Sequence, residues 1–241
     1  MVSRLEARGL RKQYGQREVV KGVDLGLDQN EVFGILGPNG AGKTTTFYML
    51  LGVIKPTEGK VFLDDTELTH WPLHLRARAG LSYLPQESSI FKKLTVRQNM
   101  EIILEHTGLS RKEQRARCDA LLEELGITRL ENSRAVHLSG GERRRLEIAR
   151  ALIRSPKFIL LDEPFAGIDP LAVDDIKEII RGLKDKGIGI LISDHNVRET
   201  LSICDRASIV FEGTIILTGT PQEIAANPRA RKVYLGEEFC L

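Results

Sequence analysis

The sequence predicts an α/β fold, in which a sheet that contains buried parallel strands is interrupted by a helical insert. Short apolar runs bounded by turn residues indicate strands, and they alternate with helical segments along most of the chain. A glycine-rich loop at 37–42 connects one of these runs to a helical segment. Between residues 95 and 125 the spacing of apolar side chains becomes helical, and two further apolar runs follow. This order is typical of an α/β domain with an insert between two halves of its sheet.

Composition limits the classes of function. The 241 residues can bury a sizeable core. The 35 Lys and Arg nearly balance 33 Asp and Glu, so no global field favours nucleic acid, and we expect no nucleic-acid partner. Three cysteines without C-x-x-C spacing favour a reducing compartment. Charged residues interrupt every apolar run near the N-terminus, and no run approaches the roughly 18 residues of a membrane span, so we expect neither a signal peptide nor a direct span.

The expected elements follow in a definite order. Strands are predicted at 2–7, 19–27 and 31–36, then a helix from 43 to about 53, and strands at 60–63 and 81–84. Helical structure is predicted from 95 to about 125 and again at 141–153. Fully apolar runs at 158–161 and 188–192 predict buried strands, with helices between and after them.

The loop after the third predicted strand carries the most specific motif. Its sequence matches G-x-x-x-x-G-K-[ST], with the residues Gly37, Pro38, Asn39, Gly40, Ala41, Gly42, Lys43, Thr44 and Thr45. In such a loop the backbone N–H groups surround phosphates, the lysine reaches the terminal phosphates and the hydroxyl after it binds Mg²⁺. The flanking strand and helix supply the context that the motif requires, so we expect a nucleoside triphosphate here.

A second candidate phosphate surface begins the helix predicted at 141–153. Ser139 and Glu142 have the spacing of a capping box, which needs no ligand. Gly140 and Gly141 are not explained by a capping box, because each glycine costs roughly 1 kcal/mol relative to alanine inside a helix and leaves its backbone N–H bare. We therefore expect this helix start to contact phosphate as well.

Two carboxylates follow the apolar run at 158–161. A buried parallel strand brings its carboxyl end to the ligand crevice of an α/β sheet, so Asp162 and Glu163 should lie near the phosphates. Asp162 is expected to bind Mg²⁺, and Glu163 to polarise the attacking water as a general base. The alternative is an acidic turn that contacts only solvent.

Three single residues are weaker candidates. Gln86 follows the strand predicted at 81–84 and could contact Mg²⁺ or water, although a glutamine in a loop is usually only solvated. His195 follows the strand at 188–192, and this location favours a functional histidine over the more common structural one. Tyr14 could stack on adenine or be an ordinary surface aromatic.

In this order the motifs resemble those of the ATP-binding-cassette family over essentially the whole chain. Tyr14 resembles the A-loop aromatic, 37–45 Walker A, Gln86 the Q-loop, 138–142 the signature, 158–163 Walker B, 166–169 the D-loop and His195 the H-loop. The resemblance implies a P-loop NTPase domain of residues 1–241. It also implies an antiparallel β subdomain and a helical subdomain, the latter at about 87–155.

The resemblance also implies a mechanism and partners. Lys43, Gln86, Glu163 and His195 would serve ATP hydrolysis, and Thr44, Gln86 and Asp162 would hold Mg²⁺. Two subunits of a homodimer would pack head to tail, with ATP between the Walker A loop of one and the signature of the other, and Asp169 would cross the dimer. Such a dimer would be cytoplasmic and peripheral, bound to two permease subunits of the inner membrane.

Four stretches narrow the resemblance within the family. Residues 83–94, 139–145, 193–201 and 233–239 resemble ATPases of lipopolysaccharide exporters. ATPases of branched-chain amino acid importers share several of these stretches and remain the alternative. ATP-binding-cassette proteins of DNA repair or chromosome organisation carry a long coiled coil, whose heptads this sequence lacks, and those of translation usually carry two cassettes.

The apolar pair after Gln86 is the candidate contact to a membrane partner. Ile90 and Phe91 end the stretch 88–91, next to a glutamine that is expected to sense nucleotide. Exposed, they would form a groove for a partner helix; buried, they would belong to the core of the helical insert. The sequence favours neither reading.

Overall fold

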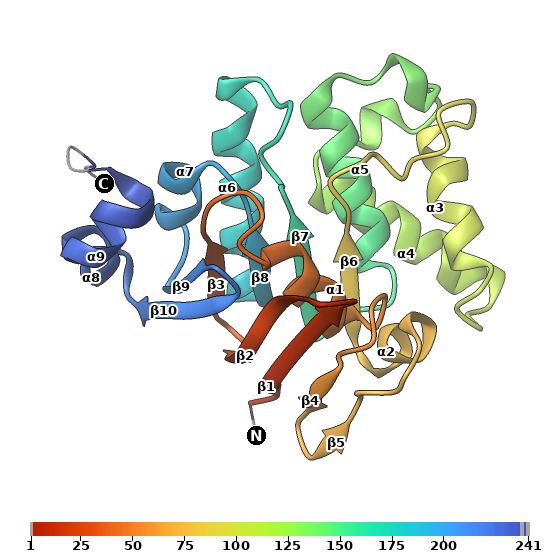
Figure 1. Ribbon diagram of the computed structural model, residues 1–241. Coiled ribbons are helices and arrows are strands. Elements are labelled where there is room, and N and C mark those ends of the chain that lie inside the picture. The colour runs from red at the N-terminus through yellow and green to blue at the C-terminus, as the bar shows by residue number, and fades with distance from the viewer. Residues whose placement is uncertain (1, 237–238, 240–241) are drawn as a thin grey trace.

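Two sheets organise the chain. The computed structural model describes residues 2–236 and 239, so Cys240 and the acidic residues 237–238 of the predicted tail motif lie outside the described residues. One sheet has four antiparallel strands in the order β2-β1-β4-β5, and the other has six strands in the order β10-β9-β3-β8-β7-β6 (Figure 1). The strands of the first sheet are β1 (Arg4–Tyr14), β2 (Arg17–Asp28), β4 (Glu58–Leu63) and β5 (Thr66–Glu67).

The six-stranded sheet brings the predicted motifs to one edge. Its strands are β3 (Val32–Leu36), β6 (Leu81–Leu84), β7 (Phe158–Asp162), β8 (Gly189–Ser193), β9 (Arg206–Phe211) and β10 (Thr214–Gly219). Strands β9, β3, β8, β7 and β6 are parallel to one another, and β10 is antiparallel to β9. Every residue of β3, β7 and β8 is buried, as continuous apolar runs covered on both faces should be. The loops that follow β3, β6, β7 and β8 therefore leave the same edge of the sheet.

Helices cover both faces of this sheet. Helix α1 (Lys43–Leu51) packs between the two sheets, where Phe47 and Leu50 are fully buried in a core shared with β1 and β2. Helix α6 (Pro170–Asp185) lies on the opposite face (Figure 1), where Ile176 and Ile180 join a second core. Helix α2 (Leu73–Ala79) follows the four-stranded sheet and leads into β6.

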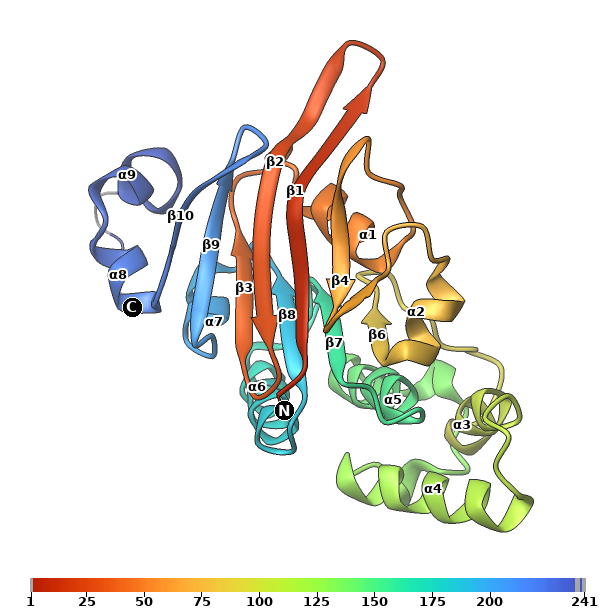
Figure 2. The same cartoon turned by 90° about the horizontal axis from the view of Figure 1, so that it is seen from below.

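The predicted helical insert lies between β6 and β7. It contains α3 (Val96–Leu104), α4 (Arg111–Glu124) and α5 (Gly140–Leu152), with helical turns at Thr128–Leu130 and Ala135–His137. These helices stand beside the six-stranded sheet in both views (Figures 1 and 2). The segment expected to be helical from 95 to about 125 is two helices, because the chain breaks at Gly108, which has a positive φ of 80°. Capping boxes at Thr95 and Ser110 begin the two helices.

The helices predicted after residue 192 are present, but two strands that were not predicted lie among them. Helix α7 (Val197–Leu201) is followed by the antiparallel strands β9 and β10 and only then by α8 (Pro221–Ala226), α9 (Pro228–Ala230) and a last turn at Arg231–Leu235. The signal for this hairpin was present, since two apolar runs flank Glu212 and Gly213, whose positive φ values of 48° and 84° make a tight turn. Among the described residues, no helix is long and apolar enough to cross a bilayer.

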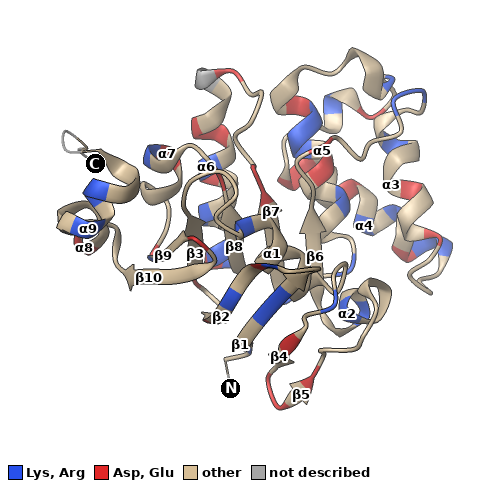
Figure 3. Ribbon diagram, in the orientation of Figure 1, with Lys and Arg blue, Asp and Glu red and all other residues tan. Residues whose placement is uncertain are grey.

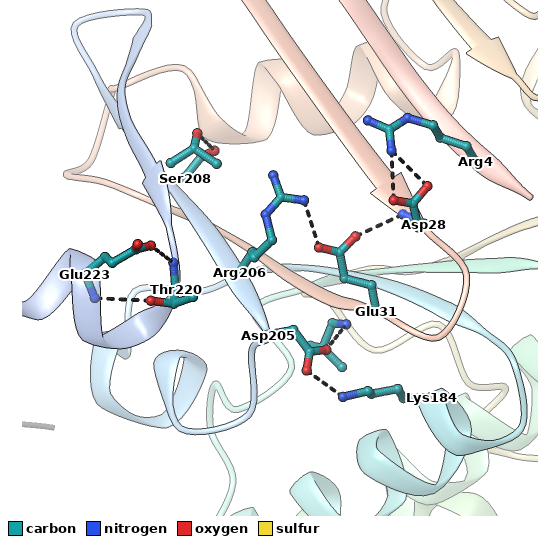
Figure 4. Close-up of polar contacts among 11 residues, drawn as sticks. Arg4, Asp28, Glu31, Lys184, Asp205, Arg206, Ser208, Thr220 and Glu223 are labelled. Atoms are coloured by element: carbon teal, nitrogen blue, oxygen red, sulfur yellow. Dashed lines mark hydrogen bonds and ion pairs between the residues drawn. The ribbon is translucent and has the colours of Figure 1, made fainter. Parts of the chain in front are cut away.

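A chain of polar contacts joins the two sheets (Figure 4). Arg4 donates to both carboxylate oxygens of Asp28, whose backbone N–H donates to Glu31. Glu31 accepts from Arg206 on β9 at 3.1 Å. In the same region Asp205 accepts from the Val32 backbone N–H at the start of β3. These contacts fix the start of β3 relative to both sheets, and β3 leads directly into the glycine-rich loop.

Candidate active site

The glycine-rich loop has a shape that side chains would prevent. Gly37, Gly40 and Gly42 have positive φ values of 147°, 77° and 103°. A Cβ atom on Gly37 would lie 2.1 Å from the Val210 carbonyl oxygen, and one on Gly42 would lie 2.8 Å from the Val19 carbonyl oxygen. The loop is therefore held tightly against β9 and β2, and Gly37 and Gly42 are required by these close approaches.

Lys43 lies over this loop. Its Nζ donates to the carbonyl oxygens of Gly37 at 2.6 Å and Pro38 at 3.0 Å. Burial lowers the pKa of Lys43, while Glu163, Asp162 and Asp194 act in the opposite direction. The lysine thus lies within electrostatic range of three carboxylates that follow two other strands. Thr44 is exposed and Thr45 half-buried on the first turn of α1.

Asp162 is a buried carboxylate with two further acids, Glu163 and Asp194, near it. Its side chain, at the end of β7, is in a residue only 4% exposed. Burial and the negative charge of Glu163 together raise the pKa of Asp162 to about 6, while a hydrogen bond with Tyr83 opposes the shift. A group of three neighbouring carboxylates, among which the pKa of Asp162 is raised, is suited to a cation.

Glu163 lies next to Gln86 and His195, two of the single candidate residues from the sequence. Its Oε2 accepts a hydrogen bond from the Gln86 amide Nε2 at 2.7 Å and lies 3.3 Å from His195 Nδ1. The backbone of Glu163 is in the left-handed region, with φ at 45°, and its N–H donates to the Ser193 carbonyl. A non-glycine residue in this region is strained, and this conformation turns the carboxylate away from the strand toward the neighbouring loops.

Asp194 was not singled out from the sequence, yet it organises this group. It is 1% exposed, and its two oxygens accept from the backbone N–H groups of Phe165 at 3.1 Å and Asn196 at 2.8 Å. It therefore ties the loop after β7 to the loop after β8 on either side of His195. Its identity as an acid directly before His195 was the only signal in the sequence.

Ser139 forms the capping box that the sequence allowed. Its hydroxyl accepts from the Glu142 backbone N–H at 3.3 Å, and Glu142 Oε2 accepts from the Ser139 N–H and hydroxyl at 3.0 Å each. Gly140 and Gly141 begin α5 and are half-buried. The capping box accounts for the local structure and leaves the expected phosphate contact of this helix start as a prediction.

The start of α5 and the loop after β7 share a small cavity. Its volume is about 120 Å³, and its lining includes Gln86, Gly140, Glu163 and Gly167. A Cβ atom on Gly140 would be 3.4 Å from the Gly167 carbonyl oxygen. Asp169, at the end of this loop, accepts through its carbonyl oxygen from the Ala172 backbone N–H at the start of α6.

The two remaining aromatic candidates are exposed. Tyr14 is 50% exposed where β1 turns into β2, and Lys12 Nζ lies 5.0 Å from its ring centroid. Ile90 is 7% exposed and belongs to the core of the insert, whereas Phe91 is 46% exposed. Ile90 thus belongs to the core of the insert, whereas Phe91 is exposed, so each residue fits a different one of the two readings that the sequence left open.

Comparison with known families identifies two matching models. The family model described as "ABC transporter" matches residues 20–166. A second model, described as "Branched-chain amino acid ATP-binding cassette transporter", matches residues 214–240.

Individual proteins match over nearly the full chain. The lipopolysaccharide export system ATP-binding protein LptB of Haemophilus influenzae is 52% identical over 241 residues, with 100% of each chain covered. The protein of the same name from Escherichia coli K12 is 52% identical over 238 residues, covering 98% of this chain and 99% of that one. Among solved structures, the ADP conformation of MJ1267, an ATP-binding cassette of an ABC transporter, has a TM-score of 0.86 at 29% identity, covering 98% of this chain and 100% of its own.

Proposed function

We propose that this chain, which belongs to the family of ABC transporter ATP-binding proteins, is the ATP-hydrolysing subunit that drives lipopolysaccharide from the inner membrane toward the outer membrane. The family establishes that the chain binds and hydrolyses ATP. The cargo and the assignment of individual residues are our inferences. The observation that carries the residue assignment is the Glu163 carboxylate, in contact with Gln86 and next to His195, beside the loop of Lys43, and the relatives named for lipopolysaccharide export carry the cargo.

The residues of the loop would hold the triphosphate of ATP. Backbone N–H groups of residues 37–45 surround its β- and γ-phosphates, and Lys43 exchanges its bonds to loop carbonyls for bonds to phosphate oxygens. Tyr14, exposed at the end of β1, would stack on adenine.

Glu163 would act as the general base. Its Oε2 accepts a proton from the water that attacks the γ-phosphorus, the bond from that phosphorus to the β-phosphate oxygen breaks, and ADP and phosphate form. Gln86, which donates to the same Oε2, orients the carboxylate and the water. His195 is 62% exposed through its side chain, so it can contact the γ-phosphate while remaining 3.3 Å from Glu163.

The donors near this group fit Mg²⁺. The buried Asp162 carboxylate, the Thr44 hydroxyl and the Gln86 amide oxygen are the hard oxygen ligands that this ion prefers. The ion would supply charge neutralisation of the β- and γ-phosphates. Asp162 would be ionised in that state, because the cation opposes the burial that raises its pKa.

A homodimer would complete the site. The start of α5, with Ser139, Gly140, Gly141 and Glu142, would contact the γ-phosphate held by the partner, and Asp169 would contact the partner across the dimer. The paired glycines at this helix start, which the capping box does not require, support this role.

Two permease subunits of the inner membrane would be the other partners, with the dimer peripheral on their cytoplasmic face. Full-length relatives of 52% identity that are named for lipopolysaccharide export support that cargo. The branched-chain amino acid importer is the second candidate, since residues 214–240 match a model of that name, but this match covers only the C-terminal segment.

Purification of the tagged chain from membranes tests the proposed cargo. We expect two integral membrane subunits to co-purify, and the complex in vesicles loaded with lipopolysaccharide to release it to an acceptor only with ATP. The matched control is the same complex carrying Glu163→Gln, which should retain its subunits and release nothing. A complex whose ATPase responds to leucine, isoleucine or valine with their binding protein, and not to lipopolysaccharide, would contradict the proposal.

A further inference from the structure

Helix α5 carries three charged side chains along its inner side. Arg144, Glu147 and Arg150 are spaced by three residues, so they follow one another along one side of the helix. Arg144 and Glu147 are 6% and 5% exposed. Charged groups this deeply buried are costly unless they are paired, so their contacts call for an explanation.

The first of them contacts the backbone on both sides of the candidate active site. Arg144 Nη1 donates to Glu147 Oε2 at 3.0 Å and to the Pro85 carbonyl at 3.2 Å, and Nη2 donates to the Asp162 carbonyl at 3.4 Å. Pro85 directly precedes Gln86, and Asp162 directly precedes Glu163. One guanidinium thus holds the two segments whose side chains meet in the bond from Gln86 to Glu163.

The last of them contacts the loop 87–94. Arg150 Nη1 donates to the Ser89 carbonyl at 2.6 Å, and its guanidinium carbon lies 5.3 Å from the centroid of the Phe91 ring. The backbone of Phe91 is fixed in turn by the fully buried Asn99, whose Oδ1 accepts from its N–H at 2.8 Å and whose Nδ2 donates to its carbonyl at 3.1 Å. Phe91 is therefore presented in one position, with Arg150 beside it.

Glu147 is the anion between these two arginines. Its Oε2 binds Arg144, while its buried Oε1, like Nε of Arg144 and of Arg150, has no hydrogen-bond partner among the described residues. The residue lines two cavities: the one of about 120 Å³ that Gln86 and Glu163 also line, and one of about 210 Å³ that Arg150 and Tyr83 also line. A buried polar atom without a partner destabilises a fold, so packing alone does not explain this carboxylate.

We propose that Glu147 is a positioning residue: with Arg144 and Arg150 on either side, it makes the placement of Gln86 and Glu163 depend on the position of the loop 87–94. The proposal rests on the proposed function, because that loop matters only if a membrane subunit contacts it. When a partner moves Phe91 and Arg150, the charge facing Glu147 changes, and Arg144 moves with the carboxylate to which it is bonded. Glu147 itself does not touch substrate.

Two variants separate positioning from stability. Replacing Arg144 and Glu147 together by Met removes the link and leaves no uncompensated charge in that pair, and such exchanges are often neutral for stability. Arg144→Lys keeps the charge beside Glu147 but lacks the planar fork that contacts two carbonyls at once. Glu123→Gln, at an exposed site on α4, is the matched control. Each is measured in the complex purified with its membrane subunits, for melting temperature, kcat and the KM for ATP.

We expect kcat to fall about tenfold or more in both variants, with the KM for ATP within about threefold of the wild type, because the loop of Lys43 is untouched. The control should match the wild type. Only a variant that melts within about 4 °C of the wild type tests the positioning role, because such a shift corresponds to a stability loss of about 1 kcal/mol or less. It is overturned if such a variant keeps wild-type kcat, or if neither variant melts that close, since the group would then be structural.

Failure of the proposed function gives a different pattern. If Glu163→Gln turns over ATP as fast as the wild type, the proposed catalytic assignment fails and the positioning role fails with it. If Glu163→Gln is inactive while a stable variant of the Arg144 and Glu147 pair keeps wild-type turnover, only the positioning role is wrong.

Discussion

Two buried charged residues in this protein, Arg76 and Asp162, have opposite electrostatic surroundings. Arg76 on α2 is 0% exposed, and its guanidinium donates to four backbone carbonyls: Met49 and Leu50 at the end of α1, and Thr69 and Trp71 before α2. Asp162, 4% exposed, lies instead near two more carboxylates, Glu163 and Asp194. The cation is surrounded by dipoles that point their negative ends at it, while the anion has two further carboxylates beside it, with Arg144 and Lys43 to oppose them.

The difference separates a structural charge from a functional one. The carbonyls that Arg76 contacts include those at the negative end of the α1 dipole, so its site is complete within the chain. Burial still lowers the pKa of Arg76 to about 10, a value that keeps it charged at neutral pH. We propose that the carboxylate site is completed only when a cation and a phosphate bind. The distribution of charged residues over the fold does not reveal this difference, because basic and acidic residues both occur throughout the helices (Figure 3).

Arg76→Met tests the first half of this comparison and should have the largest effect. Four carbonyls would lose a charged donor inside the protein, and the free energy of unfolding should fall by about 3–5 kcal/mol. Chemical denaturation of this variant and of Arg78→Met, an exposed arginine on the same helix, measures the loss. Equal stability of the two variants would show that the buried arginine is not a structural clamp.

Asp162→Asn tests the second half, and here the sign should reverse. Because the folded pKa of Asp162 is raised from 3.8 to about 6, the ionised carboxylate opposes folding above pH 6, and this opposition fades as the pH falls toward 4. At pH 7 without nucleotide, the variant should be more stable by roughly 1–3 kcal/mol. It should also lose ATP turnover.

The pH dependence supplies the control for this prediction. The stabilising effect of Asp162→Asn should shrink between pH 7 and pH 5, whereas Asp185→Asn, at an exposed carboxylate at the end of α6, should show no such trend. An Asp162→Asn protein that melts below the wild type at pH 7 would mean that the carboxylate is compensated within the chain.

Phe91→Ala removes the ring that lies beside Arg150, a charged residue of intermediate burial. Of the variants in this comparison, it should have the smallest effect on folding. With the ring 46% exposed, the melting temperature should change little, although a fully buried aromatic would cost about 3–5 kcal/mol. Association with membrane subunits should weaken by at least about 1 kcal/mol. Thermal melting and co-purification on one preparation decide the matter: unchanged association would remove this residue from the docking surface.

Sequence patterns predicted the parts of the site that depend on local structure. The motif at 37–45 is contiguous, and the ends of parallel strands must share an edge, so Gln86, Glu163 and His195 could be expected to meet. The division of Ile90 from Phe91 could not, because it depends on how Asn99 holds the loop. Arg144 and Asp194 escaped notice for the same reason, since their partners are mostly backbone atoms of segments distant in sequence.

The fold shows the same limit. Strands buried on both faces were predicted from their apolar runs, and all of them are present. The hairpin of β9 and β10 was not predicted, although apolar runs flank its turn, and the polar residues Arg206, Ser208 and Thr218 also stand in its strands. These polar residues face partners that only the folded chain supplies: Arg206 bonds Glu31, and the hydroxyls of Ser208 and Thr218 lie 2.6 Å apart.

We propose that the two carboxylates at the end of β7, Asp162 and Glu163, form the centre of ATP hydrolysis, with Glu163 as the base. Steady-state turnover and ATP binding of Glu163→Gln, compared with the wild type, measure this most directly. We predict ATP binding close to that of the wild type, a dimer that persists with ATP, and a kcat lower by about 10² or more, since a positioned base is lost. A Glu163→Gln protein that keeps near-normal turnover would contradict the account.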